Sequence, residues 1–332
     1  MVRMFADRYR YLMPGLIRRD ATLTGVVLAV LLLMPMLAQA LDAETPVGSG
    51  SVEIGHKIVL NYIEHGSGPP VIFVHGSLSD FSYWQDQVVA FSKSYRAIAY
   101  SRRYNVPNKN PAVPGYSAVT DADDLAAFIA AMHLDKAYII GHSYGALAGL
   151  FLATRHPELI RALVIAEPPA VSLLQHLSSK NAQQGQAMYA DIYRRMVKPM
   201  RARFARGDSA GGVAAFIDYV FNDPHAWEQM SPEERADSMR NAHEWEVMMT
   251  QGTLFPEIDP LAVQSIKLPV LIISGGKTMP FLALIDRELA QWIPHSRNIV
   301  FEDSGHQMWL QHPVECRDQA EAFFRAQMDP PH

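Results

Sequence analysis

Three residues that lie far apart in the chain have the side chains that nucleophilic hydrolysis requires: Ser143, His306 and Glu167. A serine hydroxyl becomes a strong nucleophile when an imidazole takes its proton, and a carboxylate can hold that imidazole in the correct tautomer. Ser143 is the centre of GHSYG (141–145), which matches the G-x-S-x-G pattern of a tight turn between a strand and a helix. Apolar AYII precedes the pentapeptide and ALAGLFLATR follows it, so the sequence supplies both elements. We therefore predict that Ser143 is the nucleophile.

His306 is the predicted general base. It ends the motif DSGH (303–306), directly after the last predicted strand, where the chain order serine, acid, histidine places the base. The chain has thirteen histidines, so this position decides the assignment. His295 and His312 are weaker candidates, because each lies beside a proline in a predicted loop or helix start. His142 adjoins the nucleophile, where it cannot reach the geometry of a base, and we expect it to be structural.

The ends of two neighbouring predicted strands are the places where the acid of such a site is expected. The loop after the strand at 269–276 reads KTMP and holds no carboxylate before Asp286, which falls inside a predicted helix. One strand earlier, RALVIAE ends in Glu167, at the carboxyl edge where functional groups of parallel sheets gather. We predict that Glu167 orients the base; the alternative is a capping or ion-pairing role. Asp303 is the rival, but it is so close in sequence to the histidine that we expect it only to shape the turn.

An attacked carbonyl oxygen becomes negatively charged and needs N–H donors beside it. The predicted strand VIFVHG (71–76) ends just before Ser77, and the backbone N–H of Ser77 is one predicted donor of this oxyanion hole. The N–H of Tyr144, directly after the nucleophile, is the second. We expect His75 to support this loop by hydrogen bonding and Trp84 to pack in the core.

Short apolar runs that alternate with longer amphipathic stretches predict the elements that position these residues. Near-continuous apolar strands separated by helices are typical of a parallel sheet that is covered on both faces. The predicted fold class is therefore α/β, with a mostly parallel sheet and helices on both faces. Predicted strands cover 58–63, 71–76, 96–101, 137–142, 161–167, 269–276 and 297–302, and predicted helices cover 118–132, 146–155, 281–292 and 313–328.

Residues 171–262 interrupt this alternation. They contain several helical stretches, no convincing strand, and many methionine and aromatic side chains. We predict a helical cap inserted between a first core segment, 41–170, and a second, 263–332. Most of these side chains must form the cap's own core, and a few are expected to line an apolar substrate pocket, for which adaptable methionine is suited. They are Met188, Met196, Met200, Phe204, Phe216, Tyr219, Phe221, Trp227, Met230, Met239, Trp245, Met248 and Met249.

Residues 1–40 have the features of an export signal. A basic stretch that ends in an arginine pair (18–19) precedes an apolar run, and AQA (38–40) has the small-x-small pattern that signal peptidases cut. We predict cleavage after Ala40 and export to the periplasm or out of the cell. The alternative is an uncleaved membrane anchor, because the uncharged stretch 21–41 is about long enough to span a bilayer. The arginine pair fits a twin-arginine signal only in part.

The charge balance argues against a polyanionic partner. The chain has 29 basic and 34 acidic residues, and 1–40 contain 5 and 2 of them, so the remainder has 24 and 32, a net charge of −8. Such a body has no electrostatic reason to bind nucleic acid or an anionic membrane. The single cysteine, Cys316, falls in a predicted helix and is expected to be structural. No Cys/His cluster has metal-ligand spacing, so we expect neither a metal nor an organic cofactor.

The motifs VHGS, GHSYGA and SGH, together with the helical insertion, resemble the α/β-hydrolase superfamily over residues 50–328. In this superfamily the acid usually follows the strand predicted here at 269–276. An acid at Glu167 resembles the subset in which it follows the sixth strand, which includes some haloalkane dehalogenases and the zearalenone lactonases. Dehalogenases and epoxide hydrolases of the superfamily use an aspartate nucleophile, so Ser143 argues against both activities.

The resemblance implies a serine hydrolase that cleaves a small apolar ester or lactone through an acyl-enzyme. Cofactor-free haloperoxidases and carbon–carbon bond hydrolases of the superfamily use a similar triad, and some ligand-binding members kept the triad, so these alternatives stay open. At YSRRY (100–104) many relatives have Asp-x-Arg-Gly, and we expect Arg102 or Arg103 to organise that loop or to bind substrate. A membrane is an expected partner only if the N-terminal segment stays uncleaved.

Overall fold

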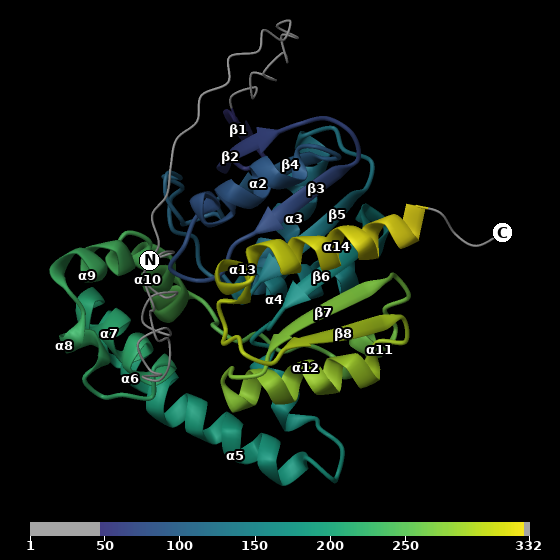
Figure 1. Ribbon diagram of the computed structural model, residues 1–332. Coiled ribbons are helices and arrows are strands. Elements are labelled where there is room, and N and C mark those ends of the chain that lie inside the picture. The colour runs from purple at the N-terminus through teal and green to yellow at the C-terminus, as the bar shows by residue number, and fades with distance from the viewer. Residues whose placement is uncertain (1–46, 329–332) are drawn as a thin grey trace, which may run out of the picture.

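An eight-stranded sheet forms the centre of the molecule (Figure 1). The computed structural model describes residues 47–328, and these contain β1 (Gly48–Glu53), β2 (Val59–His65), β3 (Pro70–Val74), β4 (Arg96–Tyr100), β5 (Ala137–His142), β6 (Ile160–Ala166), β7 (Val270–Gly275) and β8 (Ser296–Phe301). Their order in the sheet is β1-β2-β4-β3-β5-β6-β7-β8. β2 pairs antiparallel with β1 and β4, and the other neighbouring strands are parallel.

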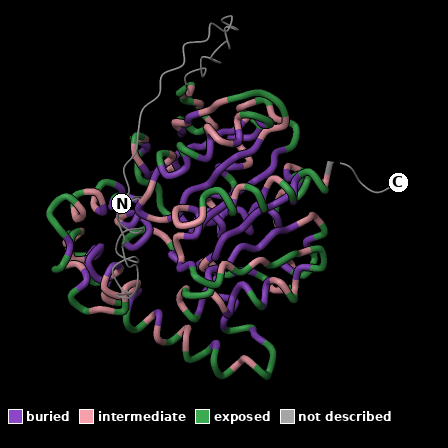
Figure 2. Tube along the Cα trace, in the orientation of Figure 1, coloured by how far each residue is buried: buried purple, intermediate pink, exposed green. Residues whose placement is uncertain are grey.

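The central strands are apolar because both of their faces are covered. Every residue of β5 and β7 is buried, and Figure 2 shows that buried residues concentrate along the central strands. The predicted fold class is therefore confirmed, and the seven predicted strands lie within two residues of the observed ends. The sequence pattern missed β1. Its residues GSGSVE are small or polar and lie exposed or half-buried at the edge of the sheet, so they carry no apolar alternation.

Each face of the sheet packs on its own set of helices. Side chains alternate along β3, so Phe73 and Ile72 belong to opposite faces. The Phe73 face is covered by α2 (Gln85–Phe91) and α14 (Pro313–Met328), and the Ile72 face by α3 (Ala118–Ala131), α4 (Tyr144–Arg155) and α12 (Pro280–Trp292). Shorter helical turns at the ends of strands are η1 (Phe81–Trp84), η2 (Pro157–Leu159) and α13 (Met308–Gln311).

Trp84 and Cys316 both lie in the core on the Phe73 face, as predicted. Trp84 is fully buried and meets the ring of Trp309 edge-on, with ring centroids 5.1 Å apart. Cys316 is buried in α14, and burial raises the pKa of its thiol. A buried, protonated thiol is a poor nucleophile, which agrees with a structural role.

The segment between β6 and β7 is helical, and within residues 47–328 it contributes no strand to the sheet. Figure 1 shows α6 to α10 gathered beside the sheet, while α5 runs past the end of the core near α12. Buried Met200, Phe204 and Met248 join one apolar cluster there, which is the packing role expected for most of these side chains. The helices of this segment are η3 (Val171–Gln175), α5 (Ala182–Ile192), η4 (Tyr193–Val197), α6 (Lys198–Phe204), α7 (Ser209–Val220), α8 (Ala226–Gln229), α9 (Pro232–Met239), α10 (Ala242–Gln251) and α11 (Pro260–Gln264).

The predicted export signal, 1–40, lies outside the described residues. In the part of the chain that the structure describes, no helix has the length and apolar character needed to cross a bilayer.

Two glycines of α4 test how closely this helix must approach the sheet. A Cβ at Gly145 would lie 2.2 Å from the carbonyl oxygen of Val74, whereas one at Gly149 would meet only a leucine methyl at 3.2 Å. We expect Gly145→Ala to lower the free energy of unfolding by about 1–3 kcal/mol through overpacking against backbone. Gly149→Ala on the same helix is the matched control, because its neighbour can move and alanine favours the helix. Equal urea midpoints for the two variants would contradict this close approach.

Candidate active site

Ser143 sits on a strained turn between β5 and α4. Its backbone has φ 54° and ψ −123°, which non-glycine residues rarely adopt, and its N–H donates to the carbonyl of Ala166 at 2.8 Å. A Cβ at Gly141 would lie 2.6 Å from the carbonyl oxygen of Gly145, so glycine is required for strand and helix to meet here. The turn presents the serine hydroxyl at the N-terminus of α4, where the helix dipole favours negative charge.

His306 is held by Glu167, the predicted acid. Its Nδ1 lies 2.5 Å from Oε2 of Glu167, whose side chain is fully buried. Because a carboxylate can only accept, Nδ1 carries the proton and Nε2 is left free to take one. This is the tautomer that a general base for a serine needs. Glu167 has φ 49°, so the residue after β6 also adopts a left-handed conformation that turns the chain out of the sheet.

The loop after β7 supplies donors to this acid instead of an acid of its own. The N–H of Gly275 donates to Oε1 of Glu167 at 2.7 Å, and Oγ1 of Thr278 donates to Oε2 at 2.7 Å. A Cβ at Gly275 would lie 2.5 Å from the carbonyl oxygen of Gly305, so this glycine lets the His306 loop pass close over the end of β7. Thr278 was missed from the sequence, because a hydroxyl that binds a carboxylate on another strand has no local pattern.

The other two carboxylates considered from the sequence do not contact His306 among the described interactions. Asp303 is 73% exposed, and its partner is Nε2 of His312, at 3.2 Å, and not His306. Asp286 is buried in α12 and accepts a hydrogen bond from Oγ of Ser274 at 2.6 Å. Burial raises the pKa of Asp286 well above its usual range, and a neutral acid cannot stabilise an imidazolium as a carboxylate does.

His142 supports the loop that carries His306. Its Nε2 donates to the carbonyl oxygen of His306 at 2.7 Å, and its ring stacks on that of Tyr83, with centroids 5.3 Å apart. Burial lowers the pKa of His142 well below its usual range, so the ring stays neutral. This is the structural role predicted for it.

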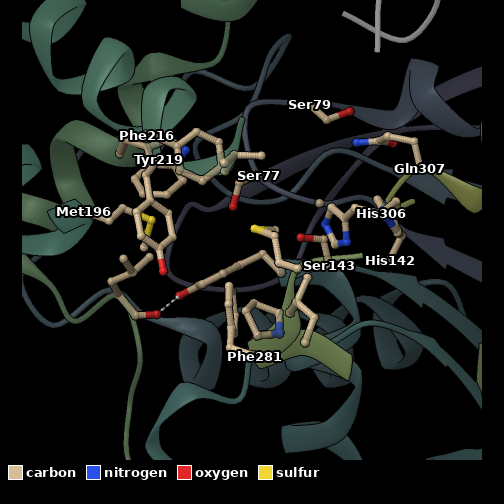
Figure 3. Close-up of a pocket in the computed structure, with 18 of the residues that line it drawn as sticks. Ser77, Ser79, His142, Ser143, Met196, Phe216, Tyr219, Phe281, His306 and Gln307 are labelled. Carbon is tan, nitrogen blue, oxygen red and sulfur yellow. Dashed lines mark hydrogen bonds between the residues drawn. The ribbon is translucent and has the colours of Figure 1, made fainter. Parts of the chain in front are cut away.

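Ser143 and His306 line the same cavity, and Figure 3 shows their side chains next to each other. The hydrogen bonds of the described residues do not include one between Oγ of Ser143 and His306; such contacts often tighten only when substrate binds. Ser77 and Tyr144 line this cavity too. Gly76 packs directly against the nucleophile, since a Cβ there would lie 3.0 Å from Cβ of Ser143. The two N–H donors of the oxyanion hole remain a prediction that this arrangement favours.

Arg102 organises the loop that carries the predicted oxyanion donor. It is fully buried, and its guanidinium donates to the carbonyl oxygens of His75 (3.2 Å) and Gly76 (3.1 Å). Its backbone N–H donates to Nε2 of His75 at 3.0 Å, which leaves Nδ1 of that ring to donate to the Gly76 carbonyl at 2.8 Å. Burial and the neighbouring Arg102 lower the pKa of His75 to about 3, so this ring stays neutral and supports the loop, as predicted.

The same arginine joins the core to the helical segment between β6 and β7. It pairs with Asp121 of α3 at 2.7 Å and with Glu244 of α10, and both carboxylates are buried. These carboxylates raise the pKa of Arg102 despite its burial, so the guanidinium stays charged. Arg103 pairs instead with Asp124 of α3. Arg102 is therefore the residue that organises the loop, and its full burial excludes direct contact with substrate.

The rest of the cavity is mostly apolar. Side chains from α7, α10 and α12 line it together with residues of the catalytic loops (Figure 3). In the described part of the chain, no group of three or more His, Cys, Asp or Glu side chains could hold a metal ion. The aliphatic and aromatic lining residues of this part are Pro169, Met196, Phe216, Tyr219, Val220, Trp245, Leu254, Phe255, Met279, Phe281, Leu282 and Leu310.

Comparison with known proteins agrees with this architecture. A family model described as alpha/beta hydrolase fold matches residues 69–313. The uncharacterized hydrolase YraK of Bacillus subtilis is 32% identical over 126 residues, which are 38% of this chain and 46% of that protein. The chain thus spans less than half the length of the first curated relatives that it matches. A 2-hydroxy-6-oxo-6-(2'-aminophenyl)hexa-2,4-dienoic acid hydrolase of Metapseudomonas resinovorans is 25% identical, over 85% of this chain and 91% of that protein.

Solved structures show the same fold. The enol-lactonase of Burkholderia xenovorans LB400 superposes with a TM-score of 0.64 at 19% identity, over 82% of this chain and 99% of that one. At this level of identity the similarity concerns the fold alone.

We expect the buried guanidinium of Arg102 to contribute far more to the free energy of unfolding than an exposed guanidinium does. Arg102→Met would leave Asp121 and Glu244 buried without their counter-ion, and we expect the free energy of unfolding to fall by about 3–5 kcal/mol. Adding Glu244→Leu should restore part of that loss. Arg155→Met is the control, because the pair of Arg155 with Asp123 is nearly half exposed on both sides and should matter little. An Arg102→Met variant as stable as Arg155→Met in urea would contradict this assignment.

Proposed function

This chain is a member of the α/β hydrolase fold family, and on that basis we propose that it is a serine hydrolase that cleaves a carboxylic ester or lactone through an acyl-enzyme on Ser143. One observation supports this proposal above the others. His306 contacts the buried Glu167 through Nδ1 and lines the same cavity as the strained Ser143. An oriented base beside a serine that faces a cavity is the arrangement that acyl transfer requires.

In the proposed reaction, Nε2 of His306 takes the hydroxyl proton while Oγ of Ser143 bonds to the ester carbonyl carbon. The carbonyl oxygen becomes an oxyanion, which the N–H groups of Ser77 and Tyr144 stabilise. The tetrahedral intermediate then expels the alkoxide, which takes the proton from His306. Water next gives a proton to His306 and attacks the acyl carbon, and release of the acid returns the proton to Ser143. In both halves the carboxylate of Glu167 stabilises the imidazolium.

The cavity supports a small apolar ester or lactone as substrate. Its walls are largely methionine, leucine and aromatic side chains, and the residues that line it include no Lys or Arg. An anionic substrate would find no cationic partner there, which disfavours a free acid such as the one in the name of the Metapseudomonas relative. We also propose that the protein acts after export, on the basis of the signal-like segment 1–40.

The first prediction of this proposal concerns the serine. A fluorophosphonate probe should label Ser143 stoichiometrically in mass-spectrometric peptide mapping, because the probe reacts with serines that a base activates. Labelling should vanish in Ser143→Ala and be weak in His306→Ala. A folded protein that resists the probe would instead favour a ligand-binding member of the fold, and tight ligand binding without turnover would then be the observation to seek.

The second prediction concerns the acid. Glu167→Gln should lower kcat for a simple ester by about 10²–10⁴-fold, because an amide cannot stabilise the imidazolium and permits the wrong tautomer. Asp303→Asn is the matched control and should keep nearly full turnover, since that carboxylate is exposed and pairs with His312. The opposite pattern, with Asp303→Asn inactive and Glu167→Gln active, would mean that the acid is assigned wrongly.

A further inference from the structure

The active-site cavity is chemically asymmetric. Most of its wall is apolar or aromatic, but Ser79 and Gln307 bring polar side chains to the end that holds His306, whereas the hydroxyl groups of Ser77 and Tyr219 lie elsewhere on the wall. Figure 3 shows these two residues and His306 toward one end of the cavity, and Met196 and Phe216 toward the other. In binding sites, a few fixed polar groups on an apolar wall determine how the ligand is oriented.

The amide of Gln307 is held in one orientation. The hydroxyl of Tyr83 donates to Oε1 of Gln307 at 3.1 Å. The phenol of Tyr83 carries the proton that this contact needs, because burial raises its pKa well above the usual range. Its ring is fixed in turn by stacking on His142. The oxygen of the amide is therefore occupied, and its nitrogen is presented to the cavity, directed toward Ser79 in Figure 3.

The donor groups of Gln307 and Ser79 have no protein partner within residues 47–328. Neither Nε2 of Gln307 nor the hydroxyl of Ser79 makes a hydrogen bond to another described residue. A donor on a cavity wall must bind water or ligand, because leaving it unpaired costs free energy. An apolar group that displaced this water would leave the donors unpaired, whereas a polar group would replace the water's hydrogen bonds.

The reaction itself decides which part of the substrate lies at this end. His306 must hand its proton to the oxygen of the departing alcohol, so the alcohol part of the ester lies on the His306 side of Ser143. Gln307 directly follows His306 in the chain and lines the cavity beside it. The acyl part then extends the other way, toward Met196 and Phe216 (Figure 3), and Trp245 packs against Phe216 there.

We propose that the substrate is an ester of an apolar acid with a polar alcohol, whose oxygen acceptor, a hydroxyl or carbonyl close to the ester bond, is bound by Nε2 of Gln307 and the hydroxyl of Ser79. This inference rests on the proposed ester hydrolysis. It assigns Gln307 and Ser79 as specificity-determining residues for the leaving group. The apolar wall selects the acyl group.

The test compares two esters of the same size. 2-Hydroxyethyl hexanoate and propyl hexanoate differ only in a terminal hydroxyl or methyl on the alcohol. The quantity measured is the ratio of their kcat/KM values, which we expect to favour the hydroxyethyl ester in the wild-type protein. Comparing this ratio between variants cancels the intrinsic reactivity of the two esters.

Three variants probe the polar end. Gln307→Glu keeps an acceptor for Tyr83 but removes the donor, and Gln307→Met removes both; each should lower the ratio about tenfold, the loss of one good hydrogen bond. Ser79→Ala should lower it by a smaller factor. Phe216→Leu is the control on the apolar wall, and it should change turnover of both esters equally and leave the ratio unaltered.

The outcomes separate this inference from the function on which it rests. A lowered ratio in both Gln307 variants, with propyl hexanoate still hydrolysed, supports the polar leaving-group site. Hydrolysis of both esters with the same ratio in all variants overturns that site and leaves ester hydrolysis standing. If the wild-type protein hydrolyses neither ester while Ser143 still reacts with a fluorophosphonate, the proposed ester chemistry fails, and this inference fails with it.

Discussion

The last hydrogen bond between β5 and β6 determines where the chemistry can occur. Ser143 donates its N–H to the carbonyl of Ala166, so the residues that follow the two strands, Ser143 and Glu167, leave the sheet at the same level. Both adopt positive φ, a conformation that costs a non-glycine residue about 1–3 kcal/mol. The buried parallel ladder on either side provides the rigid support that such strain needs. A slip of one residue between these strands would separate the nucleophile from the acid and turn every side chain of the strand to the opposite face.

Around this fixed edge, the site is completed by segments from distant parts of the sequence. Arg102 connects the loop at His75 and Gly76 to α3 through Asp121 and to α10 through Glu244. The helical segment between β6 and β7 therefore does more than enclose the cavity, because one of its carboxylates neutralises the cation that supports the loop beside the nucleophile. This guanidinium links the helical segment to the loop beside the nucleophile, and Asp80 adds a second link through Arg240 and Asn241.

The sequence predicted those features that have a local pattern. Apolar runs located seven of the strands, and the pentapeptide and the chain order located Ser143 and His306 where the structure places them around one cavity. Glu167 followed from the lack of a carboxylate after β7. Partners such as Thr278 and Glu244 could not be predicted, because a single hydroxyl or carboxylate that reaches another segment leaves no periodic trace in the chain. The sequence pattern did not predict β1 for a related reason, since an exposed edge strand of small residues has no apolar face.

The way in which Glu167 is held bears on how such a site can change over evolution. Donors from the end of β7 and the loop after it, Gly275 and Thr278, reach the same carboxylate that His306 contacts. The ends of β6 and β7 therefore meet at the carboxylate that contacts the base, so an acid at either strand end would lie near the same imidazole. A lineage could carry a carboxylate at both strand ends for a time and then lose either one, while activity continued throughout. Two arrangements that differ in the strand that carries the acid, with the same chain order of serine, acid and histidine, can in this way be neighbours in sequence space.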